Sequence, residues 1–173
     1  MRRLIASFAA VAVAAVLFAV PSTAGPDKIA FPASYKDHVL YTTVDRHDTK
    51  QFRELWGTAP AVGAMKAGQP LPSGSVLTLV QYKAQVDAAG NPVKGPDGRF
   101  VKGDLIAYTV MEKRAGWGTE YPDEWRNGDW EYAAFSTDGV RRDGPTASCF
   151  ECHGALKDLD YVYTKFEIGE LTK

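Results

Sequence analysis

Alternation of apolar and polar residues marks three strands in the middle of the chain. Residues 75–86 (SVLTLVQYKAQV) and 104–113 (DLIAYTVMEK) are rich in β-branched and aromatic residues, and residues 87–98 between them carry Gly and Pro turn signals. Residues 130–136 (WEYAAFS) form a third run of the same kind. Three consecutive strands predict an antiparallel meander, in which the first two form a hairpin with a long, decorated tip.

The segments that flank this meander are less regular. Residues 59–67 predict a short helix that ends at Gly68. Other segments leave alternatives open: 35–40 as a short helix, 38–44 equally as a strand, 49–56 as a helical turn or a strand, and 160–167 as a last strand or an extended tail. A sheet with short helices around it predicts an α+β fold, an antiparallel β-sheet meander with short peripheral helices.

The first 24 residues have the layout of a secretory signal peptide. Two arginines precede an apolar run from Leu4 to Val20, and Pro21-Ser22-Thr23-Ala24 supplies small residues for cleavage. The run is slightly long for a signal peptide and slightly short for a spanning helix of ~20 residues, which leaves an uncleaved N-terminal anchor as the alternative. We therefore expect an exported, periplasmic protein with one domain over residues 25–173. The chain has a net charge of −1 and no basic run, which argues against nucleic acid as a partner.

The only two cysteines lie in Cys149-Phe150-Glu151-Cys152-His153. A thioredoxin-type dithiol would begin a helix in a βαβ unit, and a zinc site would need a second ligand pair at a related spacing. A disulfide between these cysteines would close too small a loop to add much stability. The remaining interpretation is covalent attachment of one haem c, with thioethers to Cys149 and Cys152 and with His153 as the proximal iron ligand. Export fits this interpretation, because bacteria attach haem c outside the cytoplasm.

The sixth coordination position of the iron then decides the function. A methionine there, either Met65 or Met111, would give a low-spin electron-transfer cytochrome. An open position would give a gas-binding protein or a catalyst. His38 and His47 lie in polar sequence, which favours a solvated surface role for both.

Three stretches carry a resemblance to a known family. The late CFECH motif followed by Asp160-Tyr161-Val162-Tyr163-Thr164, the strand after Leu71-Pro72-Ser73-Gly74-Ser75, and the stretch Gly128-Asp129-Trp130-Glu131-Tyr132 resemble the cytochrome P-460 family, which includes the cytochromes c′-beta. The resemblance runs from about Tyr35 to Thr164. It implies an antiparallel sheet, a homodimer, and a five-coordinate haem with histidine on the proximal side.

The resemblance also implies two kinds of distal pocket. Enzymatic members oxidise hydroxylamine with a haem-linked lysine and a distal carboxylate, and pass electrons to a redox partner; c′-beta members bind nitric oxide or carbon monoxide in an apolar pocket. Lys83 is the only lysine in the strand expected to supply the link, on the same face as Leu77, Leu79 and Gln81 by alternation. Leu79 is an alternative alignment for the linking position. Asp143 is the one carboxylate shortly upstream of Cys149.

Haem also needs a large apolar enclosure. Aromatic residues gather around the third strand, and they are the candidates for its walls: Trp117, Tyr121, Trp125, Trp130, Tyr132, Phe135 and Phe150. We expect most of them to be ordinary core residues. One or two, from the strands rather than the loop, should face the iron.

Overall fold

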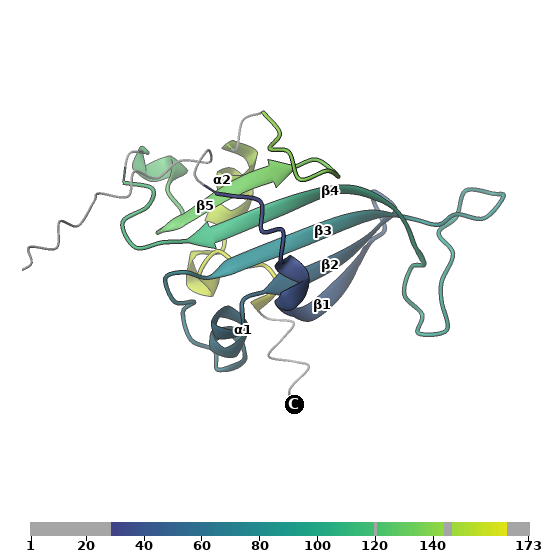
Figure 1. Cartoon of the computed structure of the whole chain (residues 1–173), viewed down its shortest axis with the longest axis horizontal. Coiled ribbons are helices and arrows are strands. Elements are labelled where there is room, and N and C mark those ends of the chain that lie inside the picture. Colours follow the sequence, from purple (N-terminus) through teal and green to yellow (C-terminus); the bar gives the residue numbers. More distant parts are fainter. Residues whose placement is uncertain (1–28, 120, 144–146, 166–173) are drawn as a thin grey trace, which may run out of the picture.

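The computed structural model describes residues 29–119, 121–143 and 147–165. Its centre is a five-stranded sheet in the order β1-β2-β3-β4-β5, with every neighbouring pair antiparallel (Figure 1). The strands are β1 (Val39–Arg46), β2 (Gln51–Gly57), β3 (Val76–Ala84), β4 (Lys102–Lys113) and β5 (Trp130–Phe135). The helices are α1 (Ala59–Lys66) and α2 (Ala147–Gly154), with 3₁₀ helices at Tyr35–Asp37, Asp123–Trp125 and Lys157–Leu159.

The predicted meander is confirmed. The three expected strands are β3, β4 and β5, and the β3–β4 hairpin has a long tip that projects from the sheet (Figure 1). The predicted helix is α1, which ends where Gly68 takes a left-handed conformation (φ +67°) that a residue without a side chain adopts at little cost.

The open alternatives resolve toward strands at the start of the sheet. Residues 39–46 and 51–57 form β1 and β2, and the helix expected over 35–40 is reduced to a single 3₁₀ turn. The strand or extended tail expected over residues 160–167 is absent from the described residues 160–165, which form turns instead. Two consecutive left-handed residues, Asp160 and Tyr161, prevent an extended path there.

Each face of the sheet carries its own hydrophobic cluster, because successive side chains of a strand point to opposite faces. On β3, Leu77 packs into a cluster with Met65 of α1 and Phe150 of α2. Val80, by contrast, packs on the other face with Ile29 and other residues near the start of the described chain. In Figure 1, α2 accordingly lies behind the sheet and the N-terminal segment crosses in front.

Within the described residues, none of the helices has the length and apolarity needed to cross a membrane. The predicted signal peptide, residues 1–24, lies outside the described residues.

Candidate functional site

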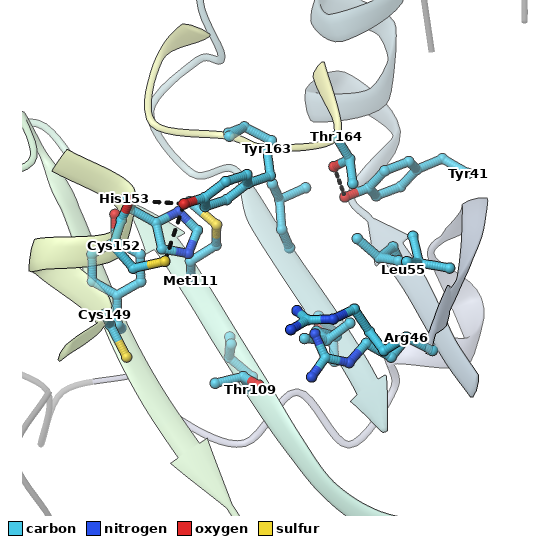
Figure 2. Close-up of a pocket in the computed structure, with 18 residues that line it drawn as sticks. Tyr41, Arg46, Leu55, Thr109, Met111, Cys149, Cys152, His153, Tyr163 and Thr164 are labelled. Carbon is cyan, nitrogen blue, oxygen red and sulfur yellow. Dashed lines mark hydrogen bonds between the residues drawn. The ribbon is translucent and has the colours of Figure 1, made fainter. Parts of the chain in front are cut away.

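A cavity of about 590 Å³ lies on the α2 side of the sheet, and it contains the sequence motif singled out above. Its size falls in the range of ~300–1,000 Å³ that is typical of sites for small molecules and cofactors. Cys149, Cys152 and His153 contribute to one wall, from helix α2 (Figure 2). The rest of the lining comes from all five strands and from the turn after α2: Tyr41, Val44, Arg46, Arg53, Leu55, Leu77, Thr78, Leu79, Thr109, Val110, Met111, Tyr132, Val162, Tyr163 and Thr164.

The two cysteines are free thiols, three residues apart on α2. Residues at this spacing lie on the same side of a helix. Cys149 is half-buried, and burial raises the pKa of its thiol. Cys152 is exposed, and its Sγ lies 3.1 Å from the hydroxyl of Tyr163. The same hydroxyl donates to the carbonyl oxygen of Cys152 at 3.0 Å.

His153 presents one ring nitrogen to the protein and leaves the other as a ligand. Its Nδ1 lies 2.6 Å from the carbonyl oxygen of Tyr161. A carbonyl can only accept, so Nδ1 carries the proton and Nε2 keeps its lone pair. Burial lowers the pKa of the imidazole, which favours the neutral form that binds metals.

Aromatic rings on both sides fix the orientation of His153. The ring of Tyr132 lies 4.9 Å from the imidazole, centroid to centroid, and the ring of Tyr163 lies 5.3 Å away at a steep interplanar angle of 78°. Phe150 packs in turn against Tyr132 at 5.0 Å. The imidazole is therefore held by packing as well as by its hydrogen bond.

Two arginines bring positive charge to the wall formed by β1 and β2. Figure 2 shows Arg46 extending into the cavity from the side opposite Cys149, and Arg53 also lines it. Arg46 pairs with Asp48 at 2.6 Å, which lowers the pKa of that carboxyl to about 2. Within the part of the chain that the structure describes, the hydrogen bonds of the Arg53 side chain go to a neutral group, the side-chain oxygen of Gln51, at 2.8 and 3.0 Å. Burial, and then repulsion by Arg46, lowers the pKa of Arg53. The lowered pKa means that the charged form of Arg53 is destabilised here, and an anion beside it would stabilise that form.

These residues fit a covalently attached haem. The two thiols lie on one helix beside an imidazole whose Nε2 keeps its lone pair, and the wall across the cavity is cationic. Haem carries its vinyl groups on one edge and its two propionates on the opposite edge. Cys149 and Cys152 would therefore hold the vinyl edge, while Arg46 and Arg53 suit the propionate carboxylates, which arginine binds with strong charged hydrogen bonds.

The predicted distal residues do not meet at this cavity. Lys83 is exposed near the end of β3 and Asp143 is exposed ahead of α2; neither lines the cavity. Leu79, the alternative linking position, does line it. Of the two methionines, Met111 lines the cavity, whereas Met65 is buried in the core beneath α1.

Of the seven aromatic candidates, only Tyr132 lines the cavity. Tyr121, Trp130 and Phe150 pack in the cluster behind it, Trp117 and Phe135 belong to the opposite face, and Trp125 is exposed. Tyr132 belongs to strand β5; that it faces the iron stays a prediction. Sequence reasoning missed Tyr41, Arg46, Arg53 and Tyr163. If residues 51–57 had been assigned to a strand, the alternation of faces would have put Arg53 and Leu55 on the same side of the sheet, facing the cavity.

A family model described as Cytochrome P460 matches residues 32–164 of the 173-residue chain. The matched segment contains the whole sheet, α2 and every residue that lines the cavity. A search of curated proteins found no match.

Proposed function

Because the chain belongs to the cytochrome P460 family, we propose that it is an exported mono-haem c cytochrome with an open distal position. Cys149 and Cys152 would carry the thioethers, and His153 would be the proximal ligand through Nε2. Arg46 and Arg53 would neutralise the propionates. When bound, the haem supplies an iron that can take a small ligand or exchange an electron.

The ligand we propose is nitric oxide or another small neutral diatomic molecule. The observation that carries this choice is the lining of the cavity, which among the described residues includes six aliphatic or methionine side chains on the cavity side of the sheet but no lysine and no carboxylate. The aliphatic part of this lining excludes water from a bound neutral ligand, and the lining has no lysine or carboxylate to take up protons. Oxidation of hydroxylamine requires proton removal, and Lys83 and Asp143 stand outside the cavity wall. Hydroxylamine oxidation therefore stays a prediction of the family resemblance alone.

Electron transfer by a low-spin haem is the second candidate, and a single observation favours it. Met111 lines the cavity from β4. Among the described lining residues it is the one methionine, so its thioether sulfur could bind the iron as sixth ligand. In that case the sixth position would be filled and diatomic ligands would bind poorly. Met65 has no such role, because it lies in the core away from the cavity.

Optical spectroscopy of the purified protein separates the two. We expect high-spin ferric bands, and a ferrous form that binds nitric oxide stoichiometrically. A long-wavelength charge-transfer band typical of methionine-ligated ferric haem, lost in Met111→Leu, would instead establish the electron carrier. An altered ferrous Soret band in the unliganded protein would indicate a lysine link and revive the hydroxylamine enzyme.

Intact mass after denaturation tests the attachment itself. We expect one covalent haem in the native sequence and none in the double variant Cys149→Ala/Cys152→Ala. His153→Ala keeps both thioethers, so its mass should still include haem while its spectrum loses the histidine ligand. Haem that stays attached in the double variant would refute the proposal.

Location and partners are part of the same proposal. Attachment of haem c requires export, and residues 1–24 have the layout of a signal peptide, which supports a periplasmic location. A periplasmic haem that changes oxidation state also requires a redox partner. The family resemblance adds a homodimer, which sedimentation of the haem-loaded protein would test.

A further inference from the structure

The turn after α2 contains two neighbouring residues in an uncommon backbone conformation. Asp160 (φ 54°, ψ 34°) and Tyr161 (φ 62°) are both left-handed, although neither is glycine. Such residues cost of order 1 kcal/mol or more each and persist only where their surroundings fix them. Two in succession call for a strong local constraint.

The Asp160 carboxylate supplies that constraint by joining three separate parts of the fold. It accepts from the backbone N–H of Leu71 at 2.7 Å and from Nζ of Lys113, at the end of β4, at 2.8 and 2.9 Å. It also accepts from the indole Nε1–H of Trp130, at the start of β5, at 3.3 Å. The carboxylate and the ammonium are 13% and 15% exposed, so this ion pair is largely shielded from water.

The lysine of this pair has a second contact that holds it in place. Its Nζ lies 5.6 Å from the centroid of the Trp130 ring, within cation–π range. Trp130 is fully buried in the core cluster on the cavity side of the sheet. Asp160 is therefore anchored to a fully buried residue of this core cluster.

The residue after Asp160 supplies the carbonyl oxygen that accepts the hydrogen bond of His153. Tyr161 follows Asp160 directly, and its carbonyl oxygen accepts the hydrogen bond from Nδ1–H of the imidazole, with 2.6 Å between Nδ1 and the oxygen. We infer that Asp160 is a positioning residue for the proximal histidine: its carboxylate locks the left-handed turn that presents the Tyr161 carbonyl to Nδ1. This inference rests on the proposed function, in which Nε2 of His153 binds the haem iron.

A fixed acceptor at Nδ1 has an electronic consequence. It sets the tautomer and makes Nε2 a more basic ligand, which stabilises ferric over ferrous iron. When the turn loosens, the hydrogen bond lengthens and the imidazole becomes a weaker donor. The reduction potential should then rise, and the iron–histidine stretching frequency of the ferrous form should fall.

The test uses the full-length, haem-loaded protein and two variants. Asp160→Asn keeps the shape but turns an amide toward the Lys113 ammonium. Asp160→Gly suits a left-handed backbone but removes every acceptor. Resonance Raman of the ferrous form and a spectroelectrochemical titration give the two measurements. We expect both variants to lower the stretching frequency and to raise the midpoint potential, by about 59 mV for each tenfold loss of relative ferric affinity.

Asp45→Asn is the matched control. The Asp45 carboxylate also accepts a backbone N–H, that of Phe100 at 3.2 Å, faces an arginine at 3.9 Å and is 9% exposed. It alternates with Val44 and Arg46, which line the cavity, so it points to the other face of the sheet. We expect this variant to lose stability while the stretching frequency and the potential stay at native values.

Several results would overturn the inference. One is a stretching frequency and a midpoint potential that stay at native values in Asp160→Asn. Another is the same native values in Asp160→Gly. A third is a shift of both readouts in Asp45→Asn that equals the shift in the Asp160 variants. If Asp160→Asn fails to fold, Lys113→Met weakens the same network from its other end and should move both readouts in the same direction by less. Absence of a histidine-ligated haem in the native protein would overturn the proposed function itself, and the inference with it.

Discussion

The side-chain amide of Asn127 donates to the carbonyl oxygen of Phe150 at 3.0 Å, and so ties the loop before β5 to the centre of α2. The same amide nitrogen donates to the hydroxyl of Tyr132 at 3.0 Å. Asn127 is buried, so both acceptors depend on it rather than on water. It follows that one amide holds the helix with the two cysteines against the strand that supports His153.

Replacement of Asn127 by alanine should destabilise the haem-loaded protein. It leaves the Phe150 carbonyl and the Tyr132 hydroxyl buried without this donor, at a cost of about 1–3 kcal/mol. Urea unfolding followed at the Soret band measures the loss. Asn91→Ala, in the exposed hairpin tip, is the control, with an expected change within about 0.5 kcal/mol. Equal effects of the two substitutions would show that Asn127 does not secure α2.

Arg53 tests whether the cationic wall meets an anion. If it binds a propionate, Arg53→Met should destabilise the haem-loaded protein by about 1.5–3 kcal/mol, the range for hydrogen bonds to charged groups. The stability of Arg53→Lys should lie between that of the native protein and that of Arg53→Met, because lysine keeps the charge but loses the paired geometry of the guanidinium. The same unfolding assay applies, with Lys66→Ala as the control, because Lys66 is an exposed residue of α1.

The sign of the Arg53 effect is informative. Without an anion, loss of the arginine would relieve both its burial and its repulsion by Arg46, and Arg53→Met would be neutral or stabilising. A stabilised variant would therefore contradict the assignment of this wall to the propionates.

Lys83 and Asp143 should be dispensable. Both are exposed and outside the cavity wall, so Lys83→Ala and Asp143→Asn should leave the optical spectrum and nitric oxide binding unchanged. Spectra of the ferric, ferrous and nitric oxide-bound forms provide the measurement, with Leu79→Ala, which alters the wall itself, as the positive control. A shifted Soret band in Lys83→Ala would show that this lysine is linked to the haem.

The sheet could be predicted from the sequence only where its pattern was unambiguous. β3, β4 and β5 have long runs of β-branched and aromatic residues, whereas β1 and β2 carry charges such as Asp45, Arg46 and Arg53 that obscure the alternation. Those charges are tolerated because β1 is an edge strand and because both arginines face the cavity rather than a packed core.

The candidate site could be predicted in part for a similar reason. The predicted haem anchor is a contiguous motif, so the sequence alone indicates Cys149, Cys152 and His153 as one cluster, and the structure places all three at the same cavity. The groups around them depend on long-range contacts, such as Tyr161 with His153 and Asp160 with Lys113. The left-handed turn that makes these contacts contains no glycine, the residue that usually indicates such a turn in a sequence. For this reason the pattern of residues 160–167 predicts a strand or an extended tail instead.

Tyr35, on the sheet face opposite the cavity, should make the protein sensitive to alkali. It is 6% exposed, and burial, followed by the neighbouring Tyr108, raises its pKa from 10.0 to about 12. Above pH 10 the unfolded chain releases this proton while the folded chain retains it. The contribution of Tyr35 to stability should therefore be fully present below pH 10 and be lost between pH 10 and 12, by up to about 1.4 kcal/mol per pH unit.

Unfolding by urea at intervals from pH 8 to pH 11.5 would measure this loss, with Tyr35→Phe as the matched variant. Phenylalanine keeps the ring, which packs edge-on against Trp56 at 5.7 Å, but has no proton to lose. The slope above pH 10 should be shallower in Tyr35→Phe, although some slope remains because burial also raises the pKa of Tyr82 and Tyr132. Identical slopes in the two proteins would show that Tyr35 ionises as freely in the folded state as in the unfolded chain.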